Sequence, residues 1–527
     1  MSEPSNQQRL SSRGARLWRR LVYLPLLAVV VLPFVLDLSS LAADPAATGV
    51  AAASTPVAAA AAAVDKPSML ENLLPIGILL AVIGLVFWRL PKVELGHSKA
   101  YLKRRALNWL PLGLTYSFLY MARYNLSVAK KEFGAVMDND DFSIIFMVGT
   151  IVYGVSFLLN GPLTDKFGGR RTIIVSAIGS ALANIAMGVV TMLGATDNLT
   201  VTFSILYAIN MYFQSFGAVA IVKVNAPWFH VRERGTFGAI FGILISLGIY
   251  FAYDWGRIIV ENLPLEWVFL LPAGILLVFA FLDVLWVRDT PADAGLQNFD
   301  PGDARVNEDG PKLGVWAMFR LMFSTRVILI ISLIEFCSGF LRQSIMQYMP
   351  FYAKQTGRGG EFVFEHWGVF ICCAGILGGM VAGIISDRIF DSRRGPVSAF
   401  LYGIMLLGSI VTLFTYDSSL IGPMSILMSM AVIGVHGMLS GTASMDFGGR
   451  KNTGIAVGII DGFVYLGTGT MALINSFVLP SEKTPEAADP TSWLPLFIAM
   501  IPVAFIGLVL ATRVWNARAR PKAAVGH

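Results

Sequence analysis

The chain has 527 residues, of which 55% are hydrophobic and only 14% are charged. Soluble domains carry about 25% charged residues, and helices of about 20 apolar residues match the ~30 Å hydrocarbon layer of a bilayer. The composition therefore predicts an all-α polytopic membrane protein and excludes a soluble enzyme, a secreted disulfide scaffold and a disordered chain. The formal net charge of +6 resides mostly in short loops between apolar runs, so we expect the lipid bilayer as a partner and no nucleic acid.

The N-terminal region, 1–103, contains two apolar runs at 21–36 and 72–90, which predict a two-helix hairpin. A basic lead of about 20 residues before the first run favours an uncleaved anchor, and the small residues of LSSLAADP keep a cleaved signal peptide as the alternative. We expect the hairpin to target or stabilise the protein in the membrane, or to dock a membrane partner. The expected segments are 1–43 with the first helix, an Ala/Pro-rich linker at 44–71, and 72–103 with the second helix.

Twelve further apolar runs follow from about residue 104 and predict a bundle of twelve transmembrane helices. The polar stretch 288–322, rich in Pro, Gly and Asp, predicts a linker between two six-helix halves, 104–287 and 323–515, with a tail at 516–527. The predicted spans lie near 105–133, 142–163, 172–194, 199–224, 235–260, 265–287, 324–353, 364–386, 397–415, 420–445, 453–479 and 492–514.

Positive charge predicts the orientation of these spans. One set of alternate loops, together with the C-terminal tail, carries 19 Lys and Arg residues, against six in the other set. Because basic loops are retained in the cytoplasm, the first set and both chain termini are predicted to be cytoplasmic.

An internal repeat relates the two predicted halves. The segment GPLTDKFGGRR at 161–171 follows the second span, and GIISDRIFDSRR at 383–394 follows the eighth. One six-helix unit thus occurs twice in parallel, as in transporters whose halves are related by an axis along the membrane normal. The turn residues predicted to act as conformational gates are Gly161, Asp165, Arg170, Gly383, Asp387 and Arg388.

Two arginines occupy corresponding positions inside apolar runs of the two repeats. Arg123 precedes Asp165 by 42 residues, and Arg342 precedes Asp387 by 45 residues. A two-fold arrangement would make the two arginines face each other across a central cavity. Since a guanidinium is permanently charged and donates paired N–H groups, the pair predicts a binding site for a phosphate group. The alternative is that each arginine reaches the membrane interface or pairs with an acid.

Other polar side chains in the apolar runs complete the candidate site. Tyr116 and Tyr120 lie seven and three residues before Arg123, so all three occupy adjoining helix faces. Tyr153 and Tyr465 are further candidate hydroxyl donors. The candidates for coupling or for compensating the arginine charge are Asp461, Glu335 and His436. A packing role is the alternative for each of these side chains.

Six segments spread over both halves carry a family resemblance. They are YSFLYMARYNLSVAKKEF (116–133), GVSFLLNGPLTDKFG (154–168), APWFHVRERGTFG (226–238), VRDTPADAGL (287–296), GFLRQSIMQYMPFYAKQTG (339–357) and DFGGRKNTGIAVGIIDGFVYLG (446–467). The chain resembles the major facilitator superfamily over about 104–515. Within it, the chain resembles the organophosphate:phosphate antiporters, which include glycerol-3-phosphate and hexose-phosphate transporters and glucose-6-phosphate translocases. The resemblance implies phosphate binding by Arg123 and Arg342, with Tyr116, Tyr120, Tyr153 and Tyr465 in the substrate pocket.

The chain departs from the family pattern around the organic part of the substrate. Where glycerol-phosphate transporters have a lysine on the second helix, this chain has Phe157, and where they have a histidine on the fifth, it has Ile245. The residue after Arg123 is Tyr124 rather than a basic residue. The arginine pair is kept, and the identity of the phosphate ester stays open.

We therefore expect a secondary transporter, not an enzyme, that exchanges a sugar phosphate or glycerol phosphate type of metabolite for inorganic phosphate by alternating access. The sequence contains no nucleotide phosphate loop and no CxxC pair, and neither a cofactor nor a metal site is expected. The alternatives are a membrane sensor for a phosphorylated metabolite and a proton-coupled organic anion transporter. A monomer in a bacterial inner membrane is the expected form.

Overall fold

The computed structural model describes residues 77–85, 88, 96–195, 197–225, 227–230, 234–298, 320, 323–324, 326–390 and 393–516. The side chains of residues 165, 234–241, 384, 387–388 and 441–457 are outside this description. The predicted span 21–36, the predicted linker 44–71 and most of the predicted linker 288–322 also fall outside it. Of the second predicted span, residues 77–85 are helical.

The first half of the bundle consists of the six spans expected from the sequence. They are α3 (Lys99–Phe133), α4 (Asn139–Phe167), α5 (Gly169–Met192), α6 (Leu199–Asn225), a span made of α7 (Arg234–Tyr250), the π-helical segment η4 (Phe251–Trp255) and α8 (Gly256–Asn262), and finally α9 (Trp267–Trp286). Local chemistry sets their ends. Asp138 begins α4 through a capping box with Asp141, and Gly168, at φ +88°, makes the turn between α4 and α5.

The second half repeats this arrangement. Its spans are α11 (Arg326–Gln343) continued by the π-helical segment η6 (Ser344–Tyr348) and α12 (Met349–Gln355), α14 (Trp367–Ile389) preceded by the short α13 (Phe362–Glu365), α15 (Arg394–Thr415), α16 (Ile421–His436) with the π-helical segment η7 (Gly437–Ala443), α17 (Ser444–Val478) and α18 (Leu494–Arg513). Single 3-10 turns occur at η2 (Gly134–Val136), η5 (Ala292–Ala294), η8 (Pro485–Ala488) and η9 (Pro490–Trp493).

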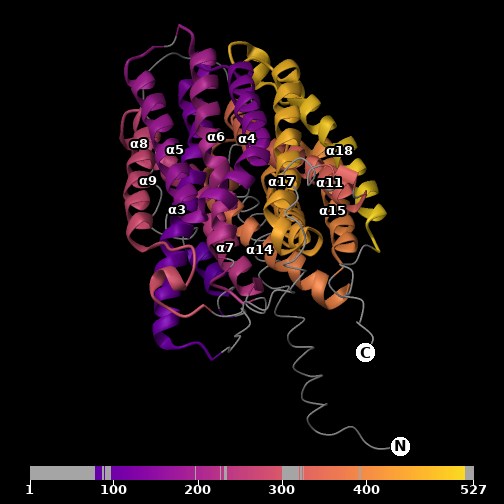
Figure 1. The fold of residues 1–527 in the computed structure, drawn as a ribbon. Coiled ribbons are helices and arrows are strands. Elements are labelled where there is room, and N and C mark those ends of the chain that lie inside the picture. Colours follow the sequence, from indigo (N-terminus) through magenta and orange to yellow (C-terminus); the bar gives the residue numbers. More distant parts are fainter. Residues whose placement is uncertain are drawn as a thin grey trace, which may run out of the picture.

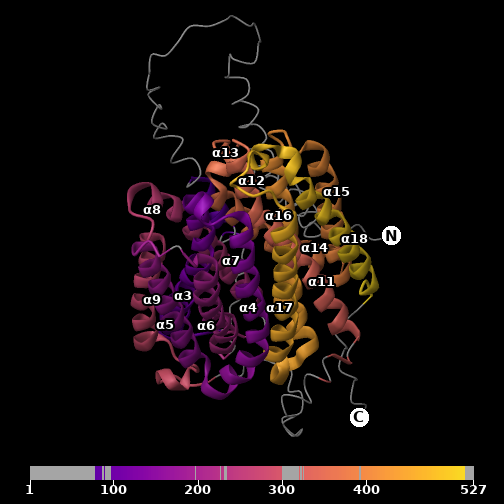
Figure 2. The same ribbon diagram turned by 90° about the horizontal axis from the view of Figure 1, so that it is seen from above.

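The two halves stand side by side (Figure 1), the first in indigo to magenta and the second in orange to yellow. Helices α4 and α17 pack against each other at the boundary, and the view turned by 90° shows the same neighbours (Figure 2). Helices α7 and α14 form a second contact between the halves. The twelve-helix bundle of two six-helix halves is therefore the architecture predicted from the sequence.

The outer surface of the bundle suits a lipid environment. Among the described residues, nine helices are long and apolar enough to cross a membrane, and the apolar part of α14 is shorter, at Trp367–Gly383. Large apolar side chains remain exposed on the outside, as at Phe281, Phe414 and Phe477, which are 61%, 80% and 81% exposed. A contiguous apolar exterior of this kind is stable only against hydrocarbon, so the chain is a multi-pass membrane protein.

Candidate functional site

Arg123 has all three of its guanidinium nitrogens engaged by neutral acceptors. It projects from α3 and is 2% exposed. Its Nε–H donates to Gln214 Oε1 at 2.7 Å, and its two terminal nitrogens donate to Tyr153 OH at 2.7 Å and Tyr465 OH at 3.0 Å. These acceptors come from α6, α4 and α17, so the guanidinium joins both halves.

Aromatic rings surround the same guanidinium. Its carbon lies 4.7 Å from the ring centre of Tyr120 and 4.3 Å from that of Tyr153, within the range of cation–π attraction. Tyr116 packs edge-on against Tyr120 with ring centres 5.2 Å apart. The charge of Arg123 is thus solvated by neutral dipoles and π-faces, and Tyr116 acts through Tyr120.

Arg342 presents a different environment. It lies near the end of α11 and is 6% exposed. Two of its buried nitrogens, Nε and one terminal nitrogen, have no hydrogen-bond acceptor among the described residues. Its guanidinium carbon lies 5.8 Å from the ring centre of Tyr465, the same distance that separates Arg123 from that ring. Burying an unsatisfied charged donor costs free energy, so this site is suited to an anion that accepts these N–H groups.

Close contacts between helices place Arg342 and Tyr465 together. A Cβ atom at Gly339 would overlap the carbonyl group of Val464, and a Cβ atom at Gly467 would overlap that of Phe336. These two glycines let the backbones of α11 and α17 approach each other on either side of the site. Glycine at these two positions therefore allows the backbone contact that places Arg342 close to Tyr465.

Gln343 at the end of α11 and Gln347 in the π-helical segment η6 link the two halves just after Arg342. Gln343 Nε2 donates to Tyr124 OH at 3.0 Å, and Tyr253 OH donates to Gln347 Oε1 at 3.0 Å. A π-turn inserts one residue into a helix and is frequent at functional sites. Here it lies between two glutamines of the second half that both contact helices of the first half.

The titratable candidates lie in the second half, and within the described part of the chain none of them forms an ion pair with an arginine. Glu335 Oε2 contacts His436 Nδ1 at 2.9 Å, and Asp461 accepts a hydrogen bond from Ser440. Glu335 is fully buried and Asp461 is 7% exposed. Glu335 precedes Arg342 by seven residues, which separates the two by about 10.5 Å along the helix.

The predicted gating turns are partly described. Gly161 lies in α4 and Gly383 in α14, and the Arg170 amide donates to Asp289 Oδ1 at 2.8 Å while its guanidinium donates to Val284 O at 2.6 Å. These contacts join the α4–α5 turn to the last turn of α9 and to the segment that follows it. The side chains of Asp165, Asp387 and Arg388 are outside the description, so their gating role stays a prediction.

Polar contacts between the halves gather at the end of the bundle where α3 meets α4, called here the α3–α4 end. Lys130 forms a buried ion pair with Glu482, and Asp138 accepts hydrogen bonds from Ser481 and from the Glu482 amide at 2.7 Å. Burial raises the pKa of Asp138, but the hydrogen bonds from Ser481 and from the Glu482 and Asn139 amides outweigh it and leave the pKa below its usual value. The α3–α4 end is therefore closed by charged contacts.

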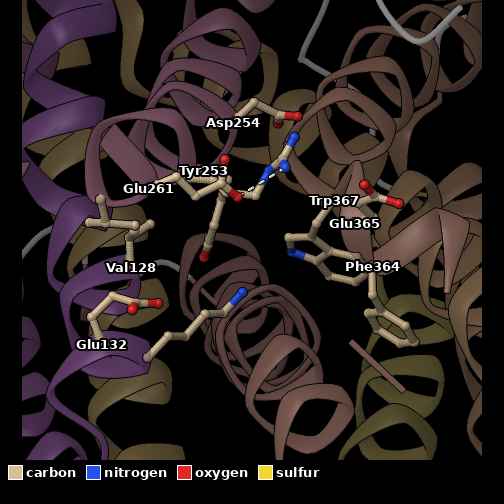
Figure 3. A pocket seen from close by; sticks show the side chains of 12 residues that line it. Val128, Glu132, Tyr253, Asp254, Glu261, Phe364, Glu365 and Trp367 are labelled. Atoms are coloured by element: carbon tan, nitrogen blue, oxygen red, sulfur yellow. Dashed lines mark hydrogen bonds and ion pairs between the residues drawn. The ribbon is translucent and has the colours of Figure 1, made fainter. Parts of the chain in front are cut away.

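A cavity of about 250 Å³ lies near this closed end, away from the arginine pair. Figure 3 shows Val128 and Glu132 on one side and Phe364 and Trp367 on the other. Its charged lining consists of four carboxylates and two cations, a formal sum of −2: Glu132, Asp254, Glu261, Glu365, Lys131 and Arg257. A net negative wall disfavours phosphate, so this cavity is a poorer anion site than the arginine pair.

Three site residues were missed by the sequence reasoning. Gln214 binds Arg123, and Tyr124 with Gln343 bridges the halves. For Gln214 and Gln343 the available signal was an amide inside an apolar run, and Tyr124 was noted only as a departure from the family pattern; neither observation identifies the hydrogen-bond partner. Phe157, noted as a departure, packs edge-on against Tyr153 with ring centres 4.7 Å apart.

Comparisons with known proteins agree on one family. A family model described as Major Facilitator Superfamily matches residues 112–472. The glycerol-3-phosphate transporter of Bacillus subtilis (strain 168) is 27% identical over 458 residues, which cover 82% of this chain and 98% of that protein. The membrane sensor protein UhpC of Salmonella typhimurium is 25% identical and covers 71% and 85% of the two chains. A probable hexose phosphate transport protein of Chlamydia muridarum is 24% identical and covers 76% and 89%.

Solved structures agree on the fold. The D-xylose-proton symporter has a TM-score of 0.58 at 14% identity and covers 77% of this chain and 97% of its own. A bacterial homolog of the human lysosomal transporter Spinster, inward-facing and unoccupied, has a TM-score of 0.55 at 12% identity and covers 81% and 100%. At these identities the likeness concerns the arrangement of the helices alone.

Proposed function

Because the chain belongs to the major facilitator superfamily, we propose that it is a secondary transporter that exchanges a phosphorylated small metabolite for inorganic phosphate. The superfamily consists of transporters, and the relatives named above are transporters and a sensor rather than enzymes. Two of them are named for glycerol-3-phosphate and hexose phosphate, which supports a phosphorylated cargo.

The observation that carries the proposal is the pair of buried donors on Arg342 beside Arg123. A phosphate group offers several acceptor oxygens and a charge of about −1.5 to −2 at neutral pH. It therefore satisfies the vacant N–H groups of Arg342 and adds acceptors to Arg123 at the same time. A neutral sugar would offer these N–H groups no negatively charged acceptor.

The site around the arginines favours a different organic group from glycerol-3-phosphate. Tyr153, Phe157 and Tyr465 form an aromatic wall in which neighbouring ring centres lie between 4.2 and 6.0 Å apart. Rings of this kind pack against the apolar faces of a larger carbon skeleton, such as a sugar. We propose a sugar phosphate or a comparable ester as the cargo.

In the proposed exchange, the two halves move relative to each other around the site, so that it opens to one side of the membrane at a time. With the α3–α4 end closed by Lys130, Glu482 and Asp138, substrate access is from the opposite end. The positive charge of the loops supports a cytoplasmic location for that end and for both termini, in a bacterial inner membrane. A single chain contains both arginines, which supports a monomer as the working unit.

Counterflow in proteoliposomes tests the proposal. Vesicles loaded with labelled phosphate are diluted into buffer that contains glycerol-3-phosphate, glucose-6-phosphate, phosphoenolpyruvate or a dicarboxylate. We expect one phosphate ester to release the label, and we expect Arg342→Ala to abolish the release while the purified variant still unfolds cooperatively on heating. Release by the dicarboxylate alone would refute a phosphate-specific site and support an organic anion transporter.

The sensor UhpC among the relatives supports a second candidate function, binding without exchange. The same vesicles distinguish the two. A labelled ester that binds the purified protein but never releases phosphate would refute the antiporter and support a sensor. If the protein neither binds the ester nor releases phosphate, phosphate recognition by the arginine pair is refuted.

A further inference from the structure

A second basic site lies at the end of the bundle opposite to the α3–α4 end, where α3 begins and α9 ends. These two helices pack side by side (Figure 1). Arg104 in the second turn of α3 and Arg288 just after α9 line a cavity of about 270 Å³. Pockets for drug-sized ligands measure about 300–1,000 Å³, so this cavity fits a smaller group. The rest of its lining consists of Leu107, Leu285, Trp286, Asp293 and Ala294.

A fully buried tryptophan, Trp228, holds both arginines in place. Its ring centre lies 5.6 Å from the guanidinium carbon of Arg104, and its Nε1 donates to the carbonyl oxygen of Arg288 at 3.1 Å. Two of the segments that carry the family resemblance, 226–238 and 287–296, thus meet at the start of α3. The arginine pair of the proposed exchange site makes no use of them. This second site is therefore built in advance of any ligand.

The acceptors that these two arginines have within the protein are neutral. Arg104 donates to Trp286 O at 2.8 Å, and Arg288 donates to Val287 O at 2.7 Å, so both contact the last carbonyls of α9. Nη1 of Arg104 is buried and has no hydrogen-bond acceptor among the described residues. The two guanidinium groups also lie within electrostatic reach of each other and repel. An anion would supply both the missing acceptor and a counter-charge.

The acid in the cavity wall does not neutralise this charge. Asp293 accepts hydrogen bonds from the Thr290 amide at 3.0 Å and from the Thr290 hydroxyl at 2.7 Å, within its own turn. In the described part of the chain it forms no ion pair with Arg104 or Arg288. Two arginines and one aspartate give the wall a formal charge of +1. Guanidinium groups bind phosphate oxygens through paired N–H donors, so the wall suits a phosphate group.

Apolar side chains beside the arginines indicate the source of that phosphate. Leu107, Leu285 and Trp286 are 41%, 45% and 40% exposed. Tryptophan is enriched at the level of the lipid headgroups, and leucines at this depth face acyl chains. A phospholipid places its phosphate next to apolar chains, whereas a soluble phosphate ester has no group to cover the leucines. Basic pockets between transmembrane helices on the cytoplasmic side bind anionic headgroups, and the loop charges predict that this end is cytoplasmic.

We propose that Arg104 and Arg288 bind the phosphate group of one anionic phospholipid, whose acyl chains lie along the neighbouring leucines. The headgroup gives Nη1 of Arg104 its acceptor and offsets the repulsion between the two arginines. The bound lipid therefore stabilises the junction of α3 and α9. Since this site is separate from the arginine pair at the centre of the protein, the inference does not depend on the proposed exchange.

Native mass spectrometry of the full-length protein tests the proposal. Delipidated protein in detergent is titrated with phosphatidylglycerol or with phosphatidylcholine of the same acyl chains. We expect one phosphatidylglycerol to bind the wild type at least tenfold more tightly than phosphatidylcholine. Arg104→Gln removes one charged donor, so its affinity for phosphatidylglycerol should fall about tenfold.

Two further variants make the test specific. Arg513→Gln is the matched control, because it removes an exposed arginine from the last turn of α18, outside this cavity, and it should bind phosphatidylglycerol like the wild type. Asp293→Asn removes the negative charge from the wall but keeps an acceptor for Thr290, so its affinity for phosphatidylglycerol should rise severalfold. Because Asp293 is exposed, this variant decides the question if Arg104→Gln fails to fold.

Free glycerol-3-phosphate distinguishes a lipid from a soluble phosphate ester. It is added in excess to the Arg342→Ala variant, in which the central arginine pair is disrupted, and it should not displace the bound phosphatidylglycerol. Displacement would refute the lipid and indicate a soluble ligand. Equal affinity of the wild type for the two lipids would refute the site, as would wild-type affinity for phosphatidylglycerol in both Arg104→Gln and Asp293→Asn. A protein that binds phosphatidylglycerol as expected but shows no counterflow supports this inference and refutes only the proposed exchange.

Discussion

Replacing Arg123 by lysine separates the geometry of the guanidinium from its charge. Arg123 donates three hydrogen bonds, to Gln214, Tyr153 and Tyr465, at 2.7, 2.7 and 3.0 Å. A lysine keeps the positive charge but presents a single ammonium, which cannot hold the planar array of three acceptors and also give paired N–H groups to phosphate.

The expected size of the effect follows from the lost contacts. Hydrogen bonds to charged groups contribute about 1.5–3 kcal/mol each, and we expect two of them to be lost in the loaded state. A loss of about 3 kcal/mol weakens phosphate binding roughly 100-fold, at about 1.4 kcal/mol for each factor of ten. Because lysine keeps the positive charge, weaker phosphate binding in this variant reports the lost donor geometry and not a lost electrostatic attraction.

The assay compares the half-saturating phosphate concentration for counterflow in Arg123→Lys and in wild type. The control is Arg513→Lys, which makes the same exchange at an exposed position in the last turn of α18. Both variants should retain the wild-type thermal unfolding midpoint within a few degrees. A half-saturating concentration for Arg123→Lys within threefold of wild type would refute the argument that paired donors bind phosphate.

Three further predictions concern the surroundings of the site. Tyr465→Phe removes the hydroxyl that Arg123 contacts but keeps the ring, so phosphate binding should weaken about tenfold in calorimetry, and an unchanged affinity would contradict the contact. Gly339→Ala introduces a Cβ against α17, so thermal unfolding should show a loss of about 1–3 kcal/mol or more, and wild-type stability would contradict the close packing. Asp138 has a lowered pKa, so its contacts with the segment at Glu482 persist at neutral pH and are lost as the pH falls through that lowered pKa. Labelling of a cysteine placed at the α3–α4 end should rise in acid, and Asp138→Asn should show high labelling at every pH.

Part of the site could be predicted from the sequence because charge inside an apolar run is rare. Arg123 and Arg342 stand out in this way, and the repeat places them at corresponding positions. Tyr153 and Tyr465 were named as candidate donors, and the structure brings both hydroxyls to Arg123. The phosphate role of these residues remains a prediction that the exchange experiment tests.

Other contacts could not be predicted because they depend on how helices meet. Glu335 was considered as a partner of Arg342, but two helical turns separate them along α11, and the acid instead contacts His436 from α16. The π-helical η6 shifts the register after Arg342 by one residue, which no 3.6-residue pattern reveals. Gln214 gave no periodic signal because a single amide fits either a packing or a binding role.

Tyr465 connects the arrangement of the site with the movement of the halves. It belongs to α17 in the second half, yet its hydroxyl accepts from Arg123 in the first half and its ring lies against Arg342. A phosphate group that binds both arginines adds an ion pair between the halves beside the hydrogen bond that Tyr465 accepts and that holds Arg123 in place. Occupancy by an anion therefore strengthens the connection between the halves at the site, which holds them together there while they rock against each other and the α3–α4 end opens.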